Sequence, residues 1–115
     1  MEKTMKEVSL NDYQKMAMES AISYPLPIIY PALGLAGEAG EVADKVKKVI
    51  RDKNSDFTNV DTKHAIAEEI GDVLWYCATL SHDLGYSLEE IGQMNYEKLK
   101  SRMKRGKIHG SGDER

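Results

Sequence analysis

The chain lacks the features that disulfide-bonded, membrane-spanning, secreted and nucleic-acid-binding proteins require. Its single cysteine, Cys77, excludes an internal disulfide and is consistent with a reducing cytosol. No segment approaches the roughly 18 apolar residues of a membrane span, and the N-terminal MEKTMKEVSL lacks the apolar core of a signal peptide. The net charge of -3, with both signs interspersed, leaves no basic patch for nucleic acid. We therefore expect a cytoplasmic protein that binds neither nucleic acid nor membrane.

Proline and strand patterns are also scarce. All three prolines fall within residues 24–31 (YPLPIIYP), which predicts an ordered apolar connection because proline blocks helix continuation. Elsewhere apolar residues recur at helical spacing, and neither strand alternation nor an internal repeat is present. The 115 residues predict one all-α domain, an antiparallel four-helix bundle that assembles as an oligomer. The predicted helices are 9–22, 33–51, 62–84 and 87–105, followed by a flexible, glycine-rich tail at 106–115.

Signals for helix ends support these boundaries. Ser87 with Glu90 forms the pattern of a capping box at the start of the last helix. Ser9 with Asp12 resembles the same motif at the start of the first, with Asp in the less usual place of Glu. Gly85 is a natural residue to follow the end of the third helix.

Four carboxylates occur in two pairs: Glu38 and Glu41, then Glu69 and Asp72. Each pair is spaced i, i+3, which places both members on one face of a helix. The two helices are consecutive, so we expect them to be antiparallel neighbours. Carboxylates brought close together repel one another unless a cation lies among them, and oxygen-only clusters suit Mg²⁺, which commonly binds a substrate phosphate as well. The pattern predicts a Mg²⁺ site for a phosphorylated substrate.

A solvated charged surface is the alternative interpretation, because acidic pairs at this spacing are common on helices. Three glycines argue for a site: Gly37, Gly40 and Gly71 lie beside the carboxylates within predicted helices. Glycine costs ~1 kcal/mol relative to alanine there, which suggests the close approach of another backbone or a ligand. Lys45 can pair with Glu41, but the first pair has no obvious partner for both members.

These segments resemble a known family. Residues 34–42 (GLAGEAGEV) and 68–76 (EEIGDVLWY) look like the E-x-x-E and E-x-x-D motifs of the MazG-like all-α nucleoside triphosphate pyrophosphohydrolases. The 27 residues between Glu41 and Glu69 lie within the range of that family. Residues 95–102 (NYEKLKSR) are similar to its N-x-x-K-L-x-x-R stretch, and residues 110–113 (GSGD) to the ending of compact members. The resemblance covers about residues 10–115.

The resemblance implies Mg²⁺-dependent hydrolysis of a (deoxy)nucleoside triphosphate to monophosphate and pyrophosphate, by a homodimer or a tetramer of dimers. The residues implied to hold Mg²⁺, for which Mn²⁺ is a possible substitute, are Glu38, Glu41, Glu69 and Asp72. The residues implied to contact the nucleotide are Asn95 and Lys98, with Arg102 and Tyr76 as weaker candidates. A carboxylate that metal does not saturate, Glu38 or Glu41, is the candidate base. Many members have a second glutamate where this chain has Gly37, which leaves the number of metal ions open.

Other interpretations remain open at this stage. One is a relative that acts on a single special nucleotide such as dUTP, dCTP or phosphoribosyl-ATP, and another is a non-catalytic helical binding module. No histidine has the E-x-x-H spacing of a di-iron bundle. Cys77 lies on an apolar stripe, so we expect it in the core. The basic residues of the last helix alternate around it, and a solvated face is expected for most of them.

Overall fold

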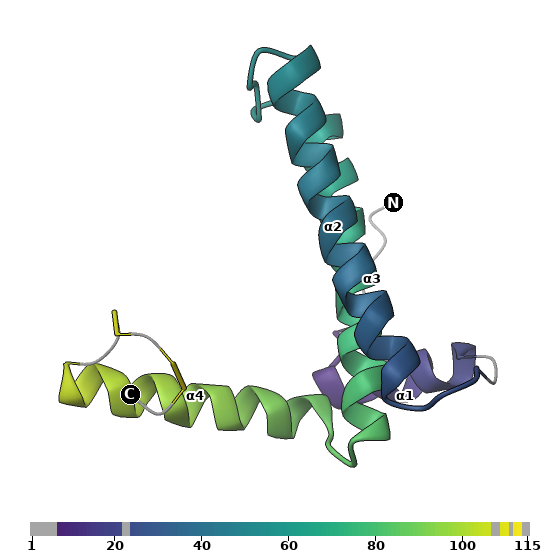
Figure 1. Cartoon of the computed structure of the whole chain (residues 1–115), viewed down its shortest axis with the longest axis vertical. Coiled ribbons are helices and arrows are strands. Elements are labelled where there is room, and N and C mark those ends of the chain that lie inside the picture. Colours follow the sequence, from purple (N-terminus) through teal and green to yellow (C-terminus); the bar gives the residue numbers. More distant parts are fainter. Residues whose placement is uncertain (1–6, 22–23, 107–108, 111, 114–115) are drawn as a thin grey trace.

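The computed structural model describes residues 7–21, 24–106, 109–110 and 112–113. Within these residues the chain forms helices and no strand, which confirms the all-α prediction (Figure 1). The helices are α1 (Leu10–Ser20), α2 (Ile29–Asp52), α3 (Val60–Asp83) and α4 (Leu88–Arg105). None of the helices so described combines the length and the apolar character that crossing a bilayer requires.

Within the described residues, one copy of the chain does not by itself form the four-helix bundle that was predicted. Helices α2 and α3 lie side by side in opposite directions, connected by residues 53–59, and make the most extensive contact in the molecule (Figure 1). Helix α1 packs against α3. Helix α4 contacts α1 and α3 but not α2 among the described residues, and it extends away from the α2–α3 pair. The described part of one chain is therefore an antiparallel helix pair, with α1 packed on α3 and α4 projecting away from the pair.

Local capping chemistry explains several of the helix ends. The Ser9 hydroxyl accepts a backbone N–H in the first turn of α1, and Ser87 with Glu90 forms both bonds of the capping box on α4. The Asn59 side chain accepts two N–H groups, which starts α3 two residues earlier than predicted. Gly106 ends α4 with a left-handed φ of 66°.

Helix α2 begins at Ile29, four residues earlier than predicted, despite a proline in its first turn. The first N–H groups of a helix have no partner within it, so Pro31 at the third position removes no hydrogen bond. The preceding connection is fixed to α3 through one carboxylate. Asp83 accepts the Tyr24 hydroxyl at 2.8 Å and the Ile28 N–H at 3.0 Å.

The buried core is small and lies where α1, α3 and the start of α4 meet. Its buried members are Ala17, Ala78 and Leu88, and the side chains packed against them are Tyr13, Leu74, Trp75 and Cys77. The position predicted for Cys77 is confirmed, and burial raises the pKa of its thiol. Trp75 also donates its indole N–H to the Ser20 hydroxyl at 2.9 Å, which attaches the end of α1 to α3.

A buried glutamine joins these elements. The Gln14 side-chain amide donates to the carbonyl oxygens of Ala78, at 3.1 Å, and Tyr86, at 3.0 Å. Its own carbonyl oxygen accepts the Leu88 N–H at 3.1 Å. One side chain of α1 therefore satisfies groups on α3, on the following loop and in the first turn of α4, and so sets where α4 begins.

Candidate metal centre and nucleotide site

Three of the four predicted carboxylates come together between α2 and α3. Glu38, Glu69 and Asp72 each offer one oxygen, and these oxygens all lie within 4.8 Å of one another. Glu38 and Glu69 are half-buried, whereas Asp72 is exposed. The antiparallel pairing of the two helices places these separate turns side by side. We call these three residues the carboxylate triad.

The triad is electrostatically unfavourable by itself. Loss of hydration raises the pKa of Glu38, and the negative charges of Asp72 and Glu69 raise it further. The group offers oxygen ligands without nitrogen or sulfur, which is the donor set that Mg²⁺ prefers. Oxygens on opposite sides of a Mg²⁺ ion lie about 4 Å apart, so the spacing of the triad fits this ion after small side-chain adjustments.

Glu41, the fourth predicted carboxylate, lies outside the triad and is exposed. Lys45 does not pair with it, although the i, i+4 spacing would allow such a pair. Instead the Lys45 ammonium lies 3.1 Å from Glu69 and donates to the Ala65 carbonyl oxygen at 3.3 Å. The side chain of Lys45 reaches across to α3 because α3 packs against this face of α2. Within the described part of the chain, Glu41 makes no ion pair.

The sequence suggested that the three glycines beside the carboxylates allow another backbone or a ligand to approach closely. Within one chain, no such approach is found at these glycines among the described residues. At Gly37, Gly40 and Gly71 an added Cβ would meet no described atom within 4 Å. Close approach of another element of the same described chain therefore does not explain them.

Close approach occurs instead at Gly34, one turn before Glu38. A Cβ at Gly34 would collide with the ring of Tyr76, so this glycine lets Tyr76 lie against α2. Burial, followed by the nearby Tyr30 and Glu38, raises the pKa of Tyr76. Tyr76, predicted to contact nucleotide, therefore lies beside the triad. A glycine at a helical position of the first motif was the available signal for this packing.

The other predicted nucleotide-binding residues lie on α4. Asn95 and Lys98 line a shallow hollow together with Ile91 and Met94. Arg102 is only 4% exposed. Because α4 does not contact α2 in the described chain, the structure does not bring these polar groups to the triad of the same chain.

Part of the predicted flexible tail lies against α4. The Arg102 Nη2 donates to the carbonyl oxygens of Gly112, at 3.4 Å, and Asp113, at 3.1 Å. The Asp113 carboxylate accepts hydrogen bonds from Arg102, at 3.3 Å, and from Lys98, at 3.2 Å. These bonds lower the pKa of Asp113. The prediction of flexibility also covers residues that lie outside the described part of the structure, namely 107–108, 111 and 114–115.

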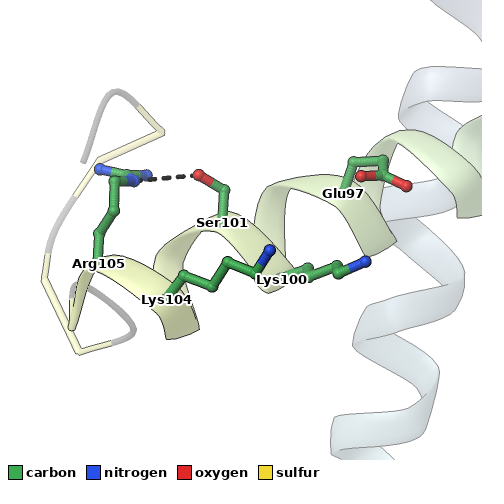
Figure 2. Close-up of a pocket in the computed structure, with 5 residues that line it drawn as sticks. All are labelled: Glu97, Lys100, Ser101, Lys104 and Arg105. Carbon is green, nitrogen blue, oxygen red and sulfur yellow. Dashed lines mark hydrogen bonds between the residues drawn. The ribbon is translucent and has the colours of Figure 1, made fainter.

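A different face of α4 carries the remaining basic residues. Figure 2 shows the hollow lined by Glu97, Lys100, Ser101, Lys104 and Arg105. Its side chains are exposed and spread along a single helix, and Arg105 donates to the Ser101 hydroxyl at 3.0 Å. This is the solvated face expected from the sequence, and it is separate from the triad.

The sequence is similar to that of a known protein family. Residues 31–106 match the model of the MazG nucleotide pyrophosphohydrolase domain. The chain is also similar to the Gene 37 protein of Mycobacterium phage L5, with 48% identity over 86 residues that cover 75% of each chain. Among solved structures, none matches significantly. The matched segment includes nearly all of α2, together with α3, α4 and all four predicted carboxylates.

Proposed function

Because the chain belongs to the MazG nucleotide pyrophosphohydrolase family, we propose that it hydrolyses a (deoxy)nucleoside triphosphate to the monophosphate and pyrophosphate with Mg²⁺. Membership of the family suggests nucleotide pyrophosphohydrolase activity in general. The observation that carries the more specific proposal is the carboxylate triad, whose oxygens lie within 4.8 Å of one another. The nucleotide substrate and the single cysteine support a cytoplasmic location.

In this proposal the triad holds the metal ion. Glu38 contributes from α2, whereas Glu69 and Asp72 contribute from α3. When bound, Mg²⁺ or Mn²⁺ supplies positive charge that offsets repulsion between the carboxylates and the triphosphate, and it lowers the pKa of water. Lys45 remains beside Glu69 and keeps part of the negative charge balanced.

Glu41 is the proposed general base. It lies one turn from Glu38 on α2 and outside the triad, so its oxygens are not committed to the ion. It accepts the proton of the water that attacks the α-phosphorus. The new bond joins the water oxygen to that phosphorus, and the bond to the bridging oxygen breaks, so pyrophosphate leaves with the bonding electrons.

Residues of α4 and Tyr76 are the proposed contacts to the nucleotide. The Lys98 ammonium can neutralise phosphate charge as a compact cation. Asn95 lines the same hollow, where the apolar side chains of Ile91 and Met94 are suited to the flat face of a base. Tyr76 lies near Glu38 and would contact the nucleotide from α3.

A second copy of the chain is the proposed partner, as a homodimer or a tetramer of dimers. Only four hydrophobic residues of the described chain are buried, few for a domain of this size. Helix α4 instead exposes large apolar side chains, and Tyr96, Leu99 and Met103 line a hollow on its surface. Exposed apolar surface of this extent favours association. Association would also allow the nucleotide-binding residues of α4 in one copy to lie near the carboxylate triad of another copy.

Light scattering coupled to size-exclusion chromatography tests the proposed assembly. We expect a mass of at least two chains, because α4 exposes its apolar side chains. Met103→Lys should lower that mass by placing a charge in the apolar hollow of α4. Met16→Lys is the matched control, since Met16 is an exposed methionine of α1 outside that hollow. A monomeric wild-type protein would contradict the proposal.

The activity is tested by measuring pyrophosphate release from the common ribo- and deoxyribonucleoside triphosphates, with Mg²⁺ and with EDTA. We expect release that requires Mg²⁺ and yields the monophosphate, and the panel would rank bases and sugars in the same experiment. Release of single phosphates would contradict cleavage between the α and β phosphates. If no substrate of the panel released pyrophosphate, the proposal of a general nucleoside triphosphate pyrophosphohydrolase would be wrong. Since dCTP belongs to the first panel, a further test of dUTP and phosphoribosyl-ATP would then separate a specialised hydrolase from a non-catalytic binding module.

A further inference from the structure

The contact between the tail and α4 is built around one carboxylate. The Asp113 Oδ1 lies 3.2 Å from the Lys98 ammonium and 3.3 Å from the Arg102 Nη2. We call these three residues the tail clasp. It lies outside the carboxylate triad, and two of its members are predicted to contact the nucleotide.

Arg102 binds the tail through backbone groups as well as through the Asp113 carboxylate. It is 4% exposed, and its Nη2 also donates to the backbone carbonyl oxygens of Gly112 and Asp113. Its Nε is buried with no hydrogen-bond partner among the described residues, so the guanidinium depends on the bonds made by its outer nitrogen. Two of those bonds go to backbone, which a change of the Asp113 side chain leaves in place.

The carboxylate therefore has its main effect on Lys98. Lys98 and Arg102 lie four positions apart on α4, where like charges on the same face repel each other. Lysine also carries its charge on a flexible stem that can move the ammonium widely. Asp113 bridges both cations and restricts the ammonium to one place.

We propose that Asp113 is a positioning residue that holds the Lys98 ammonium where the phosphates of the substrate meet it. This inference rests on the proposed function, because it assumes that Lys98 contacts a nucleotide. The restriction costs little in stability, since the Asp113 side chain is 80% exposed and surface ion pairs contribute weakly. Because Asp113 already orders the Lys98 side chain in the free enzyme, the substrate does not have to order it on binding. The loss of side-chain entropy that would weaken affinity is therefore smaller.

The test is Asp113→Asn, which keeps a carbonyl acceptor and removes the charge. We expect KM for the best triphosphate to rise about threefold, because Lys98 must then be ordered during binding, with kcat unchanged. In a Lys98→Ala background the same change should have no further effect on KM, because the residue that it positions is gone. Asp44→Asn is the matched control, since Asp44 also bridges two lysines, Lys47 and Lys48.

Three kinetic results would overturn the inference. They are a KM that stays the same in Asp113→Asn, a KM that falls because the carboxylate competes with phosphate, and an equal effect in the Lys98→Ala background. Side-chain NMR titration measures the clasp without activity: the pKa of Asp113 should lie below its usual range and rise in Lys98→Ala. An ordinary Asp113 pKa in an active enzyme would overturn the clasp alone. An inactive wild-type enzyme with a low Asp113 pKa would overturn the proposed function, and the positioning role with it.

Discussion

Asp72→Asn should lower Mg²⁺-dependent pyrophosphate release by about 10²–10⁴-fold, because it removes one charged ligand from the triad. The substitution keeps the size of the side chain, so the loss would report on charge. Binding of Mg²⁺ should weaken as well. The measurements are kcat with the best triphosphate and the rise in Tm that Mg²⁺ produces, since an ion that binds the folded state stabilises it.

Two further substitutions separate metal binding from proton transfer. Glu41→Gln should lose about 10²–10⁴-fold in kcat, as expected for a general base, and keep the rise in Tm with Mg²⁺. Glu68→Gln should change neither quantity. Glu68 is an exposed carboxylate of α3 that lies 3.3 Å from His64 and outside the triad, which makes it the matched control. Full activity in Asp72→Asn, or an equal loss in Glu68→Gln, would contradict the role of the triad.

Unfolding without metal distinguishes a catalytic cluster from a structural one. In EDTA, Asp72→Asn should melt at the same temperature as wild type or higher, because the substitution relieves repulsion with Glu38 and Glu69. A clear fall in Tm under these conditions would favour the interpretation as a structural cluster. This comparison needs no substrate, so it remains informative for a protein with an unusual nucleotide preference.

Gln14→Leu should destabilise the fold by about 3 kcal/mol, the largest loss of stability that we expect from one substitution in this chain. Leucine has a similar size but can neither donate to the carbonyl oxygens of Ala78 and Tyr86 nor accept the Leu88 N–H. Leu88 is buried, so its unpaired N–H would carry a desolvation cost. The measurement is the free energy of unfolding in urea, obtained at a fixed protein concentration because association contributes to stability.

Gln93→Leu is the control for this experiment. Gln93 is exposed on α4, where its side chain donates to Glu97 at 2.8 Å. Loss of this exposed hydrogen bond should change the free energy of unfolding by less than about 0.5 kcal/mol. Gln14→Glu gives a second test without a change of size. It keeps an oxygen for Leu88 but directs a second oxygen at two carbonyl groups, and it should also destabilise. Wild-type stability in both Gln14 variants would contradict the role assigned to this glutamine.

Features that depend on neighbours within a few residues could be predicted from the sequence. The capping box of Ser87 and Glu90 and the left-handed Gly85 that follows α3 depend on bonds within about one turn. The spacing of the carboxylates placed each pair on one helical face, and the order of the motifs indicated the family. These properties are local, so the residue types and their spacing are sufficient to specify them.

The remaining features depend on which surfaces meet. Proline in the connection predicted a later start for α2, yet Pro31 is accommodated in the first turn, where its missing N–H has no cost. Lys45 had a local partner in Glu41, but packing of α3 brought Glu69 within 3.1 Å. Helix α4 leaves the α2–α3 pair from a point set by Gln14, whose partner Leu88 lies 74 residues away along the chain. Spacing along one helix does not encode such distant contacts, and their geometry decides which three of four carboxylates converge.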